Sequence, residues 1–422
     1  MLQSLCICLF KDHMNFKQDL IYLDYAATTP CDERVLKEMS EANANLFGNP
    51  NSLHRYGEDA MSALSIARSR ICKLLKSNNY EIIFTSGATE SNKIAINRTL
   101  KKLAKNKKNH FITFKSEHKS VLEAANTAKN DDIEVSLLEV EKDGIINLEN
   151  LANHIKSTTG LVSVCYINNE TGVMQDIKKI AELCHKHEIL LHIDATQAFG
   201  KIDIDVNDLD VDMLSASGHK IYGPKGIGIL YCKKKCQTYI RMPFSNLDIE
   251  YGIRSGTTPV PICFGFGIAA QIAQQEMHEN YQKIKRLREK FIIGIQNQLS
   301  EIYINGSQTQ NYPGIINMSF RGCEGEALMM EADKIAIASG SACTSNRLTI
   351  SHVLDSMGIS HDIAQSSLRI SIGKYTTDDD INIAVENLVS ATKKLRNISP
   401  IWDMIQAGID IDTFFTDKIY HR

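Results

Sequence analysis

Short apolar segments with the character of buried strands alternate with helical segments between residues 82 and 231. The strand-like segments span residues 82–85, 110–114, 133–138, 161–166, 189–193, 211–216 and 227–231. Helical patterns lie between several of them, for example near 148–154 and over 176–186. Because parallel strands are joined by helical crossovers, this alternation predicts an α/β fold built on a mainly parallel sheet.

Polar side chains follow several of these strands at the point where each strand ends. They are Glu117, His118, Asn168, Asn169, Glu170, Asp194, Gln197, Ser217, His219 and Lys220. Right-handed crossovers bring the carboxyl ends of parallel strands to one edge of the sheet, where ligands bind. We therefore expect a cleft lined by a lysine, an aspartate, histidines and amides, which suits a phosphorylated aromatic aldehyde.

The segment FTSGATESN at 84–92 places a small-residue turn between a strand and a helix start. Such a turn aims free N–H groups and the positive end of the helix dipole at one point, which favours an anion such as phosphate. An ordinary capped helix is the alternative.

Lys220 stands between an apolar run and a glycine-punctuated turn, in SASGHKIYGPKGIG at 215–228. Glycines permit the sharp bend that can hold a side chain in a cleft. A neighbouring cation such as His219 would lower the pKa of the amine enough for attack on a carbonyl, which gives a Schiff base. The alternative is a lysine on a surface turn.

Two further strand-end residues suit the same cofactor. Asp194 could pair with a ring nitrogen and keep it protonated, which makes the ring an electron sink. His118 could stack on a ring face and transfer protons. Taken singly, Asp194 as a helix cap and His118 as a structural histidine are equally good interpretations, and only their convergence on one sheet edge favours chemistry.

A long amphipathic helix over about 271–299 marks the exit into a second lobe with two notable features. The first is a loop of small residues at 338–345 that contains Cys343, either an accessible thiol that can reach a substrate or a small buried cysteine. The second is Arg369 in a strand-like segment at 366–373, either a surface charge or a clamp for a carboxylate.

The composition excludes several classes of protein. With 422 residues the chain is expected to form two domains, and 43% hydrophobic residues with a net charge of −3 describe an ordinary globular protein without a nucleic-acid-binding surface. No run of eighteen apolar residues predicts a membrane span. Eleven scattered cysteines suit a reducing compartment, so we expect a cytoplasmic protein without a structural metal site.

We expect three segments along the chain. Residues 1–20 form an N-terminal extension, disordered or untranslated, because Met14 offers a second start and no convincing transit signal is present. Residues 21–270 form the large domain, although the first of them could join the small domain. Residues 271–422 form the small domain with the cysteine loop and a tail for partner docking.

These segments together resemble the cysteine desulfurases of the iron–sulfur cluster assembly type, in the class V branch of fold-type-I pyridoxal-phosphate enzymes. The motifs that carry the resemblance are YLDYAATTP at 22–30, FGNPNSLHRYG at 47–57, FTSGATESN at 84–92, SEHKSV at 116–121, NNETGVMQDI at 168–177, HIDATQAFGK at 192–201, SASGHKIYGPKGIG at 215–228, RSGTTPVP at 254–261, SGSACTS at 339–345 and SSLRISIGKYTT at 366–377. The resemblance implies a large domain with a seven-stranded type of sheet and a smaller α+β domain.

The resemblance also implies a role for each candidate residue. Lys220 would carry pyridoxal 5′-phosphate (PLP) as a Schiff base, His118 would stack on its ring, and Asp194 would pair with its ring nitrogen. Gln197 would contact the phenolic oxygen. The phosphate would be held by Thr89, Ser217 and His219, with Thr257 arriving from the neighbouring subunit of a homodimer, and Ala88 would also contact the cofactor. Asn169 would contact the cofactor, and Asn169 and Arg369 would bind the substrate carboxylate.

The implied reaction converts L-cysteine to L-alanine and leaves a persulfide on Cys343. The sulfur would then pass to an iron–sulfur scaffold protein or another acceptor, with tRNA thiolation as a further outlet. Cys343 could ligate a cluster transiently during transfer, but no resident metal is expected. A selenocysteine lyase or a class V aminotransferase is the enzymatic alternative.

One segment departs from the family pattern. A glycine-rich GGGxE run commonly precedes RSGT in the family, whereas residues 246–250 here read NLDIE. Leucine and isoleucine resist backbone angles that glycine adopts, so we expect the loop that carries Thr257 to sit differently. A degenerate, non-catalytic scaffold subunit is the alternative that this departure suggests.

Overall fold

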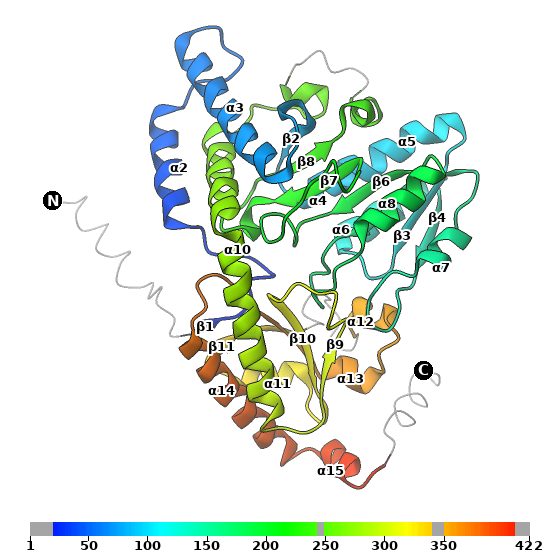
Figure 1. Cartoon of the computed structure of the whole chain (residues 1–422), viewed down its shortest axis with the longest axis vertical. Helices are drawn as coiled ribbons and strands as arrows, with labels where there is room; N and C mark the ends of the chain where they lie inside the picture. The colour runs from blue at the N-terminus through cyan, green and yellow to red at the C-terminus, as the bar shows by residue number, and fades with distance from the viewer. Residues whose placement is uncertain (1–19, 243–248, 340–349, 410–422) are drawn as a thin grey trace, which may run out of the picture.

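The computed structural model describes residues 20–242, 249–339 and 350–409. These residues form a larger part around a seven-stranded sheet and a smaller part around a four-stranded sheet. Helix α10 (Val260–Gln296) runs alongside both parts (Figure 1). Among the helices of the described ranges, none combines the length and apolar character that crossing a membrane requires.

The large sheet confirms the predicted, mainly parallel architecture. From edge to edge it holds β2 (Ile82–Thr85), β8 (Gly228–Cys232), β7 (Met213–Ser217), β6 (Leu190–Asp194), β5 (Thr159–Cys165), β3 (His110–Phe114) and β4 (Glu134–Leu138). Every pairing from β7 to β4 is parallel. Only β8 runs antiparallel to its neighbours, because the turn at 218–227 is too short for a helical crossover.

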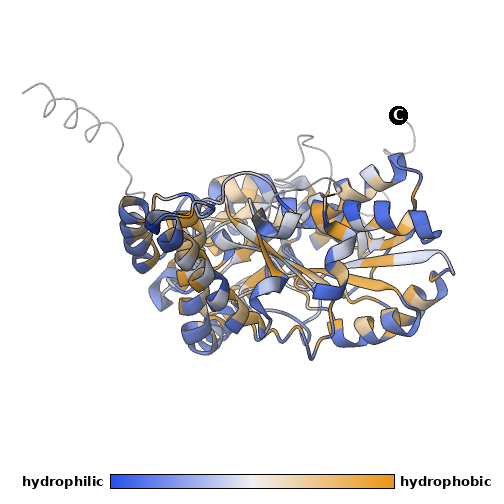
Figure 2. Ribbon diagram, turned by 90° about the horizontal axis from the view of Figure 1, so that it is seen from above, coloured by the Kyte–Doolittle hydropathy of each residue, from blue (hydrophilic) through white to orange (hydrophobic). Residues whose placement is uncertain are grey.

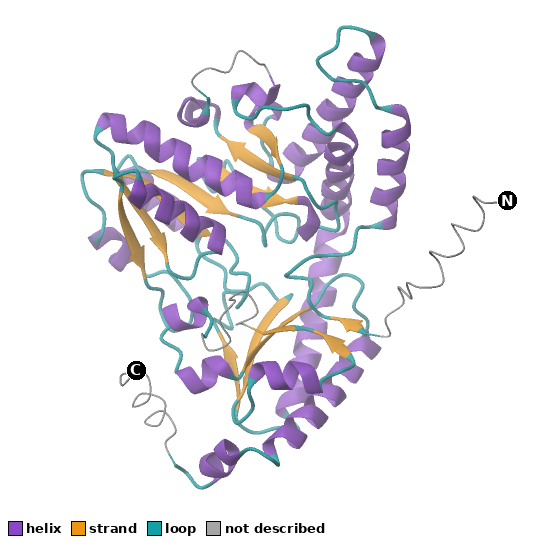
Figure 3. Ribbon diagram, turned by 180° about the vertical axis from the view of Figure 1, so that it is seen from behind, coloured by secondary structure: helices purple, strands orange, loops and turns teal. Residues whose placement is uncertain are grey.

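Helices cover both faces of this sheet (Figure 3). One face packs against α4 (Ala88–Lys93), α5 (Thr99–Leu103), α6 (Lys119–Asn130) and α9 (Gln237–Ile240). The other packs against α3 (Arg55–Leu75), α7 (Leu148–Asn153), α8 (Ile177–Lys186) and the first half of α10. Neighbouring residues of β2 enter opposite cores, Ile83 with α5 and Phe84 with α3. Burial on both faces explains the continuous apolar strands of the sequence, and Figure 2 shows hydrophilic residues on the outer helices.

Helix α10 begins at Val260, so the predicted start near residue 271 is wrong. Its first turns carry glycines that let α2 (Glu33–Asn45) and α3 approach closely. A Cβ on Gly265 would lie 2.3 Å from Met39, and one on Gly267 would lie 2.6 Å from the Ala67 Cα. Because of these glycines, the first turns lack the amphipathic pattern from which the rest of the helix was predicted.

The smaller part holds an antiparallel sheet ordered β12 (Ala338–Ser339), β13 (Ser367–Ser371), β10 (Ile315–Phe320) and β9 (Ile302–Asn305). The remaining helices are α11 (Gly325–Glu331), α12 (His352–Ser356), α13 (His361–Gln365), α14 (Asp378–Arg396) and α15 (Pro400–Gln406). Strand β1 (Ile21–Tyr22) pairs in parallel with β11 (Ile335–Ala336). The first described residues therefore belong with the smaller part, and the chain passes from there into the larger one.

Candidate active site

A cavity of about 650 Å³ opens where β5, β6 and β7 end, the sheet edge at which the sequence predicts a ligand site. The predicted cofactor and substrate residues that line it are Ala88, Thr89, His118, Asn169, Asp194, Gln197, Ser217, His219, Lys220 and Arg369. Thr257 is exposed and does not line this cavity, and Cys343 lies outside the described residues. The fold thus gathers most of the predicted site from segments far apart in the chain.

Lys220 projects from the tight turn that follows β7. Its Nζ atom donates hydrogen bonds to the carbonyls of Ala26 at 2.6 Å and Ala27 at 2.7 Å. Both carbonyls belong to the segment between β1 and α2, and both residues line the cavity. The amine is therefore seated at the cavity wall by the N-terminal segment of the chain.

Asp194 is the last residue of β6, and its carboxylate is fixed from both sides. Thr196 donates to Oδ1 from its backbone N–H at 2.9 Å and from its hydroxyl at 2.5 Å. The Asn92 amide donates to Oδ2 at 2.8 Å. Asp194 is buried yet lines the cavity, so it presents a fixed negative charge to whatever binds there.

His118 caps the N-terminus of α6, and this contact determines its tautomer. Its Nδ1 atom accepts from the backbone N–H of Ser120 at 3.2 Å and lies 2.8 Å from the Ser120 hydroxyl. The neutral ring must therefore carry its hydrogen on Nε2. Burial lowers the pKa of His118, Asp194 opposes that shift, and Lys220 adds to it. The imidazole is consequently neutral near pH 7.

The start of α4 lines one corner of the cavity, where Lys220 and Lys225 bring positive charge and the Glu90 carboxylate is held by the Ser86 N–H and Arg254. Gly87 has a φ of 156°, a conformation that favours glycine, and it leads into Ala88 and Thr89 at the helix start. Burial, together with the nearby charges of Lys220 and Lys225, lowers the pKa of His219 to about 4. Positive charge and exposed helix N–H groups are the surroundings that a phosphate requires.

Arg369 reaches the cavity from β13 of the smaller part. Its guanidinium donates to Asp24 Oδ1 at 2.8 Å and to the Asn169 carbonyl at 3.2 Å. Its buried Nε atom has no hydrogen-bond partner among the described residues. An arginine with one buried donor left over fits a carboxylate ligand.

The described ends of the segment that contains Cys343 lie in the smaller part and at the cavity's sheet edge. Before it, β12 pairs with β13. After it, the Ser351 hydroxyl donates a short hydrogen bond to Glu170, and His352 Nε2 lies 3.0 Å from the Glu117 carbonyl. Glu117 and Glu170 were predicted as strand-end residues. In the structure both contact the residues that follow the Cys343 segment, Ser351 and His352.

The atypical run before RSGT keeps its glutamate in a buried ion pair. Glu250 contacts Arg68 at 2.9 Å and accepts from the Phe84 N–H at 2.7 Å. Glu250 and Tyr251 adopt left-handed φ values of 43° and 57° although neither is a glycine. Residues 246–248 lie outside the described residues, so the expected displacement of Thr257 stays a prediction.

The sequence profile of the family described as aminotransferase class-V matches residues 21–383. The chain belongs to this family. Over 392 residues it is 46% identical to "Cysteine desulfurase IscS" of Rickettsia felis, which covers 93% of this chain and 95% of that relative. Such identity over nearly the whole length places the chain among the cysteine desulfurases of the family.

Two solved structures are similar over most of the chain. One, titled "NifS-like protein", has a TM-score of 0.81 and 34% identity and covers 89% of this chain and 100% of its own. The other, titled "SspA in complex with cysteine", has a TM-score of 0.74 and 34% identity, covering 84% of this chain and 99% of its own. The predicted fold class and family are confirmed, and the chain is an enzyme of that family.

Class V enzymes of this kind depend on PLP, and the cavity fits that cofactor. An amine, a buried carboxylate and an electropositive helix start open on one space of about 650 Å³. These are the partners that an aldehyde, a ring nitrogen and a phosphate need. The role of each predicted residue stays a prediction, because the cavity establishes their proximity and not their contacts with a ligand.

Sequence reasoning missed the residues that act through others. Asn92 and Ser120 connect Asp194 to His118, and Thr196 holds the second oxygen of Asp194. Lys225 lines the cavity beside Gly226. Each lies inside or beside a quoted motif, and a buried amide on the inner face of α4 was the available signal for Asn92.

Proposed function

We propose that this enzyme converts L-cysteine to L-alanine and transfers the sulfur to Cys343 as a persulfide, with PLP as cofactor. The observation that supports this most strongly is the convergence of Lys220, Asp194 and Arg369 on one cavity. The relatives named cysteine desulfurase and the similar structure titled as a complex with cysteine add support.

Each described residue has a task in this proposal. Bound PLP would supply an electron sink that weakens bonds at the substrate's carbon atoms. Lys220 would bind the aldehyde carbon, and Asp194 would keep a proton on the ring nitrogen. Asn169 and the guanidinium of Arg369 would bind the substrate carboxylate. His118, with its proton on Nε2, would stack on the ring and move a proton at that atom.

Cys343 performs the step that defines the reaction. Its thiolate would attack the substrate sulfur, so that an S–S bond forms as the C–S bond breaks. The electron pair of the broken bond stays with the substrate carbon, and a proton completes alanine. This step requires no external oxidant, since the sulfur only changes partners.

Alanine formation from L-cysteine tests the proposal. With PLP bound, the wild type should form alanine, and Lys220→Ala should lose at least about a thousandfold in rate because covalent attachment is lost. Lys178→Ala on the exposed face of α8 is the matched control and should keep full activity. Equal alanine formation by Lys220→Ala would contradict the proposal, and faster turnover of selenocysteine or of an amino/keto-acid pair would favour the alternative enzymes.

We also propose a homodimer, with Thr257 of each chain serving the neighbouring cavity. Phe47, Leu53 and Tyr56, around the start of α3, are 68%, 97% and 57% exposed. The rings of Phe47 and Tyr56 lie 5.1 Å apart, so they form one apolar surface that a second copy would cover. Light scattering of the purified protein should give twice the mass of one chain, and Leu53→Asp should lower the measured mass toward that of a single chain.

An iron–sulfur scaffold protein is the proposed sulfur acceptor. Ile398 and Ile401, at the junction of α14 and α15, are 75% and 40% exposed and offer an apolar docking surface. Ile398→Glu should weaken scaffold binding and leave alanine formation unchanged.

We place the protein in the cytoplasm, which the free state of the described cysteines supports, whereas tRNA thiolation stays a prediction.

A further inference from the structure

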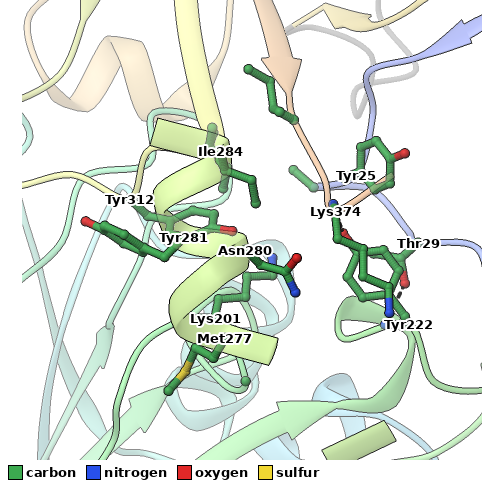
Figure 4. Close-up of a pocket in the computed structure, with 15 residues that line it drawn as sticks. Tyr25, Thr29, Lys201, Tyr222, Met277, Asn280, Tyr281, Ile284, Tyr312 and Lys374 are labelled. Atoms are coloured by element: carbon green, nitrogen blue, oxygen red, sulfur yellow. Dashed lines mark hydrogen bonds between the residues drawn. The ribbon is translucent and has the colours of Figure 1, made fainter. Parts of the chain in front are cut away.

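Lys201 is a cation near the site to which the proposed reaction gives no task. It follows Gly200, whose φ of 69° folds the chain back after β6. It lines a separate small cavity of about 40 Å³ and is absent from the lining of the large one. Figure 4 shows it beside Asn280 and Tyr281, with Lys374 and Tyr222 across the space.

The partners of the two lysines differ. Lys374 contacts the Asp32 carboxylate at 2.5 Å, so its charge is neutralised by an ion pair. Lys201 instead donates a hydrogen bond of 2.6 Å to Gln197 Oε1, and its Nζ lies 5.5 Å from the centre of the Tyr312 ring. Burial of its ammonium group, together with the nearby charges of Lys220 and Arg369, lowers the pKa of Lys201 to about 7.

Two contacts together determine which end of the Gln197 amide faces a ligand. The Ala26 carbonyl only accepts, so Nε2 must face it, 2.8 Å away, and Oε1 then faces Lys201, whose Nζ can donate whether or not it is protonated. One N–H of Nε2 remains. Gln197 lines the large cavity, and that remaining N–H is the only donor it can offer there.

Taking the proposed function as its basis, we propose that Lys201 is a positioning residue that fixes the Gln197 amide as a donor toward an oxygen of the cofactor. The same Ala26 carbonyl accepts from Lys220 at 2.6 Å. Lys201, Gln197 and Lys220 therefore form one hydrogen-bonded series around Ala26. Without Lys201, Oε1 would lose its donor and the Ala26 carbonyl alone would hold the amide, so the remaining N–H would be less firmly directed at the cofactor oxygen.

The affinity of the cofactor-free protein for PLP, measured by equilibrium dialysis, tests this inference in five proteins. Lys201→Met should bind PLP about tenfold more weakly than the wild type, because an oriented hydrogen bond is lost. Lys201→Arg keeps a donor and has the small cavity beside it, so it should bind within about threefold of the wild type. In a Gln197→Ala background, Lys201→Met should cause no further loss, since its effect passes through the amide.

Three results would contradict the inference or its basis. Unchanged PLP affinity in Lys201→Met would overturn the inference. It would also be overturned if Lys201→Met weakened PLP binding tenfold in the Gln197→Ala background as well, because the effect would then come from charge or packing alone. If Lys201→Met does not fold, Lys201→Leu, which also lacks a donor, takes its place in the same comparison. A wild type that fails to bind PLP would overturn the proposed function itself.

Discussion

The side-chain nitrogen of Asn92 donates a hydrogen bond of 2.8 Å to the Asp194 carboxylate. Its other N–H bonds to the Ser120 hydroxyl at 2.9 Å, and that hydroxyl lies 2.8 Å from His118 Nδ1. Because Ser120 accepts from Asn92, its own hydrogen is directed at His118. One amide on α4 thus orients both the carboxylate and the imidazole of the site.

Replacing Asn92 by alanine should therefore impair catalysis more than folding. Loss of a hydrogen bond to a charged group costs about 1.5 to 3 kcal/mol, so we expect roughly a ten- to hundredfold slower conversion of cysteine. Asn387→Ala on α14 is the control and should be active. Steady-state alanine formation measures the effect, and a wild-type rate in Asn92→Ala would show that the network has no catalytic role.

Stability should fall on acidification because of His192. This ring is fully buried between the hydroxyls of Ser163 and Ser215, at 2.8 and 2.9 Å. Burial lowers its pKa to about 4, with Asp194 opposing the shift. Between pH 6.5 and 4, His192 binds a proton in the unfolded chain but stays neutral in the folded chain. The free energy of unfolding therefore falls by up to about 3 kcal/mol as the pH falls through this window.

Urea unfolding of the cofactor-free protein at pH 7 and pH 5 measures this effect. His192→Gln should show a smaller loss between the two conditions than the wild type. Identical losses in both proteins would mean that His192 is not responsible.

The ion pair of Arg68 and Glu250 should dominate the stability of the region around β2. Arg68 also donates to the Ile82 carbonyl and lies 4.7 Å from the centre of the Phe84 ring. Removing one partner leaves a buried charge, which costs about 3 to 5 kcal/mol. Arg68→Met should unfold at much lower denaturant, while Arg68→Met with Glu250→Gln should recover part of the loss. A double variant no more stable than the single one would contradict this account.

Anion binding at the start of α4 should raise the pKa of His219 from about 4. A group whose pKa rises on binding takes up a proton, so affinity should increase as the pH falls below about 6. Sulfate is a suitable probe because its charge is constant in this range. The wild type should bind sulfate more tightly at pH 5 than at pH 7.5, and His219→Gln should lose most of that difference. An NMR titration that places His219 near 6.5 without ligand would contradict the prediction.

The sequence predicted the positions of the central strands along the chain and their mainly parallel arrangement, because their apolar runs are buried on both faces. Strand-end residues such as Asp194 and Lys220 followed from that order. The pairing of β1 with β11 depends on a contact between distant segments, which no local pattern contains. The antiparallel direction of β8 follows from the short turn after β7, which the sequence analysis did not use.

The second layer of the site was missed for a different reason. Asn92, Ser120 and Lys201 act through hydrogen bonds to other side chains, and the sequence does not show which side chains those are. The glycines of α10 show the converse case, since close packing against α2 and α3 overrides their low helix propensity.

Transfer of ³⁵S from labelled L-cysteine to the protein tests the central claim most directly. The wild type loaded with PLP should acquire label that a reducing thiol releases, and Cys343→Ala should acquire none, while Cys323→Ala, a buried thiol of the smaller part, should label as the wild type does. Thiol-releasable label on Cys343→Ala at the wild-type level would contradict the account.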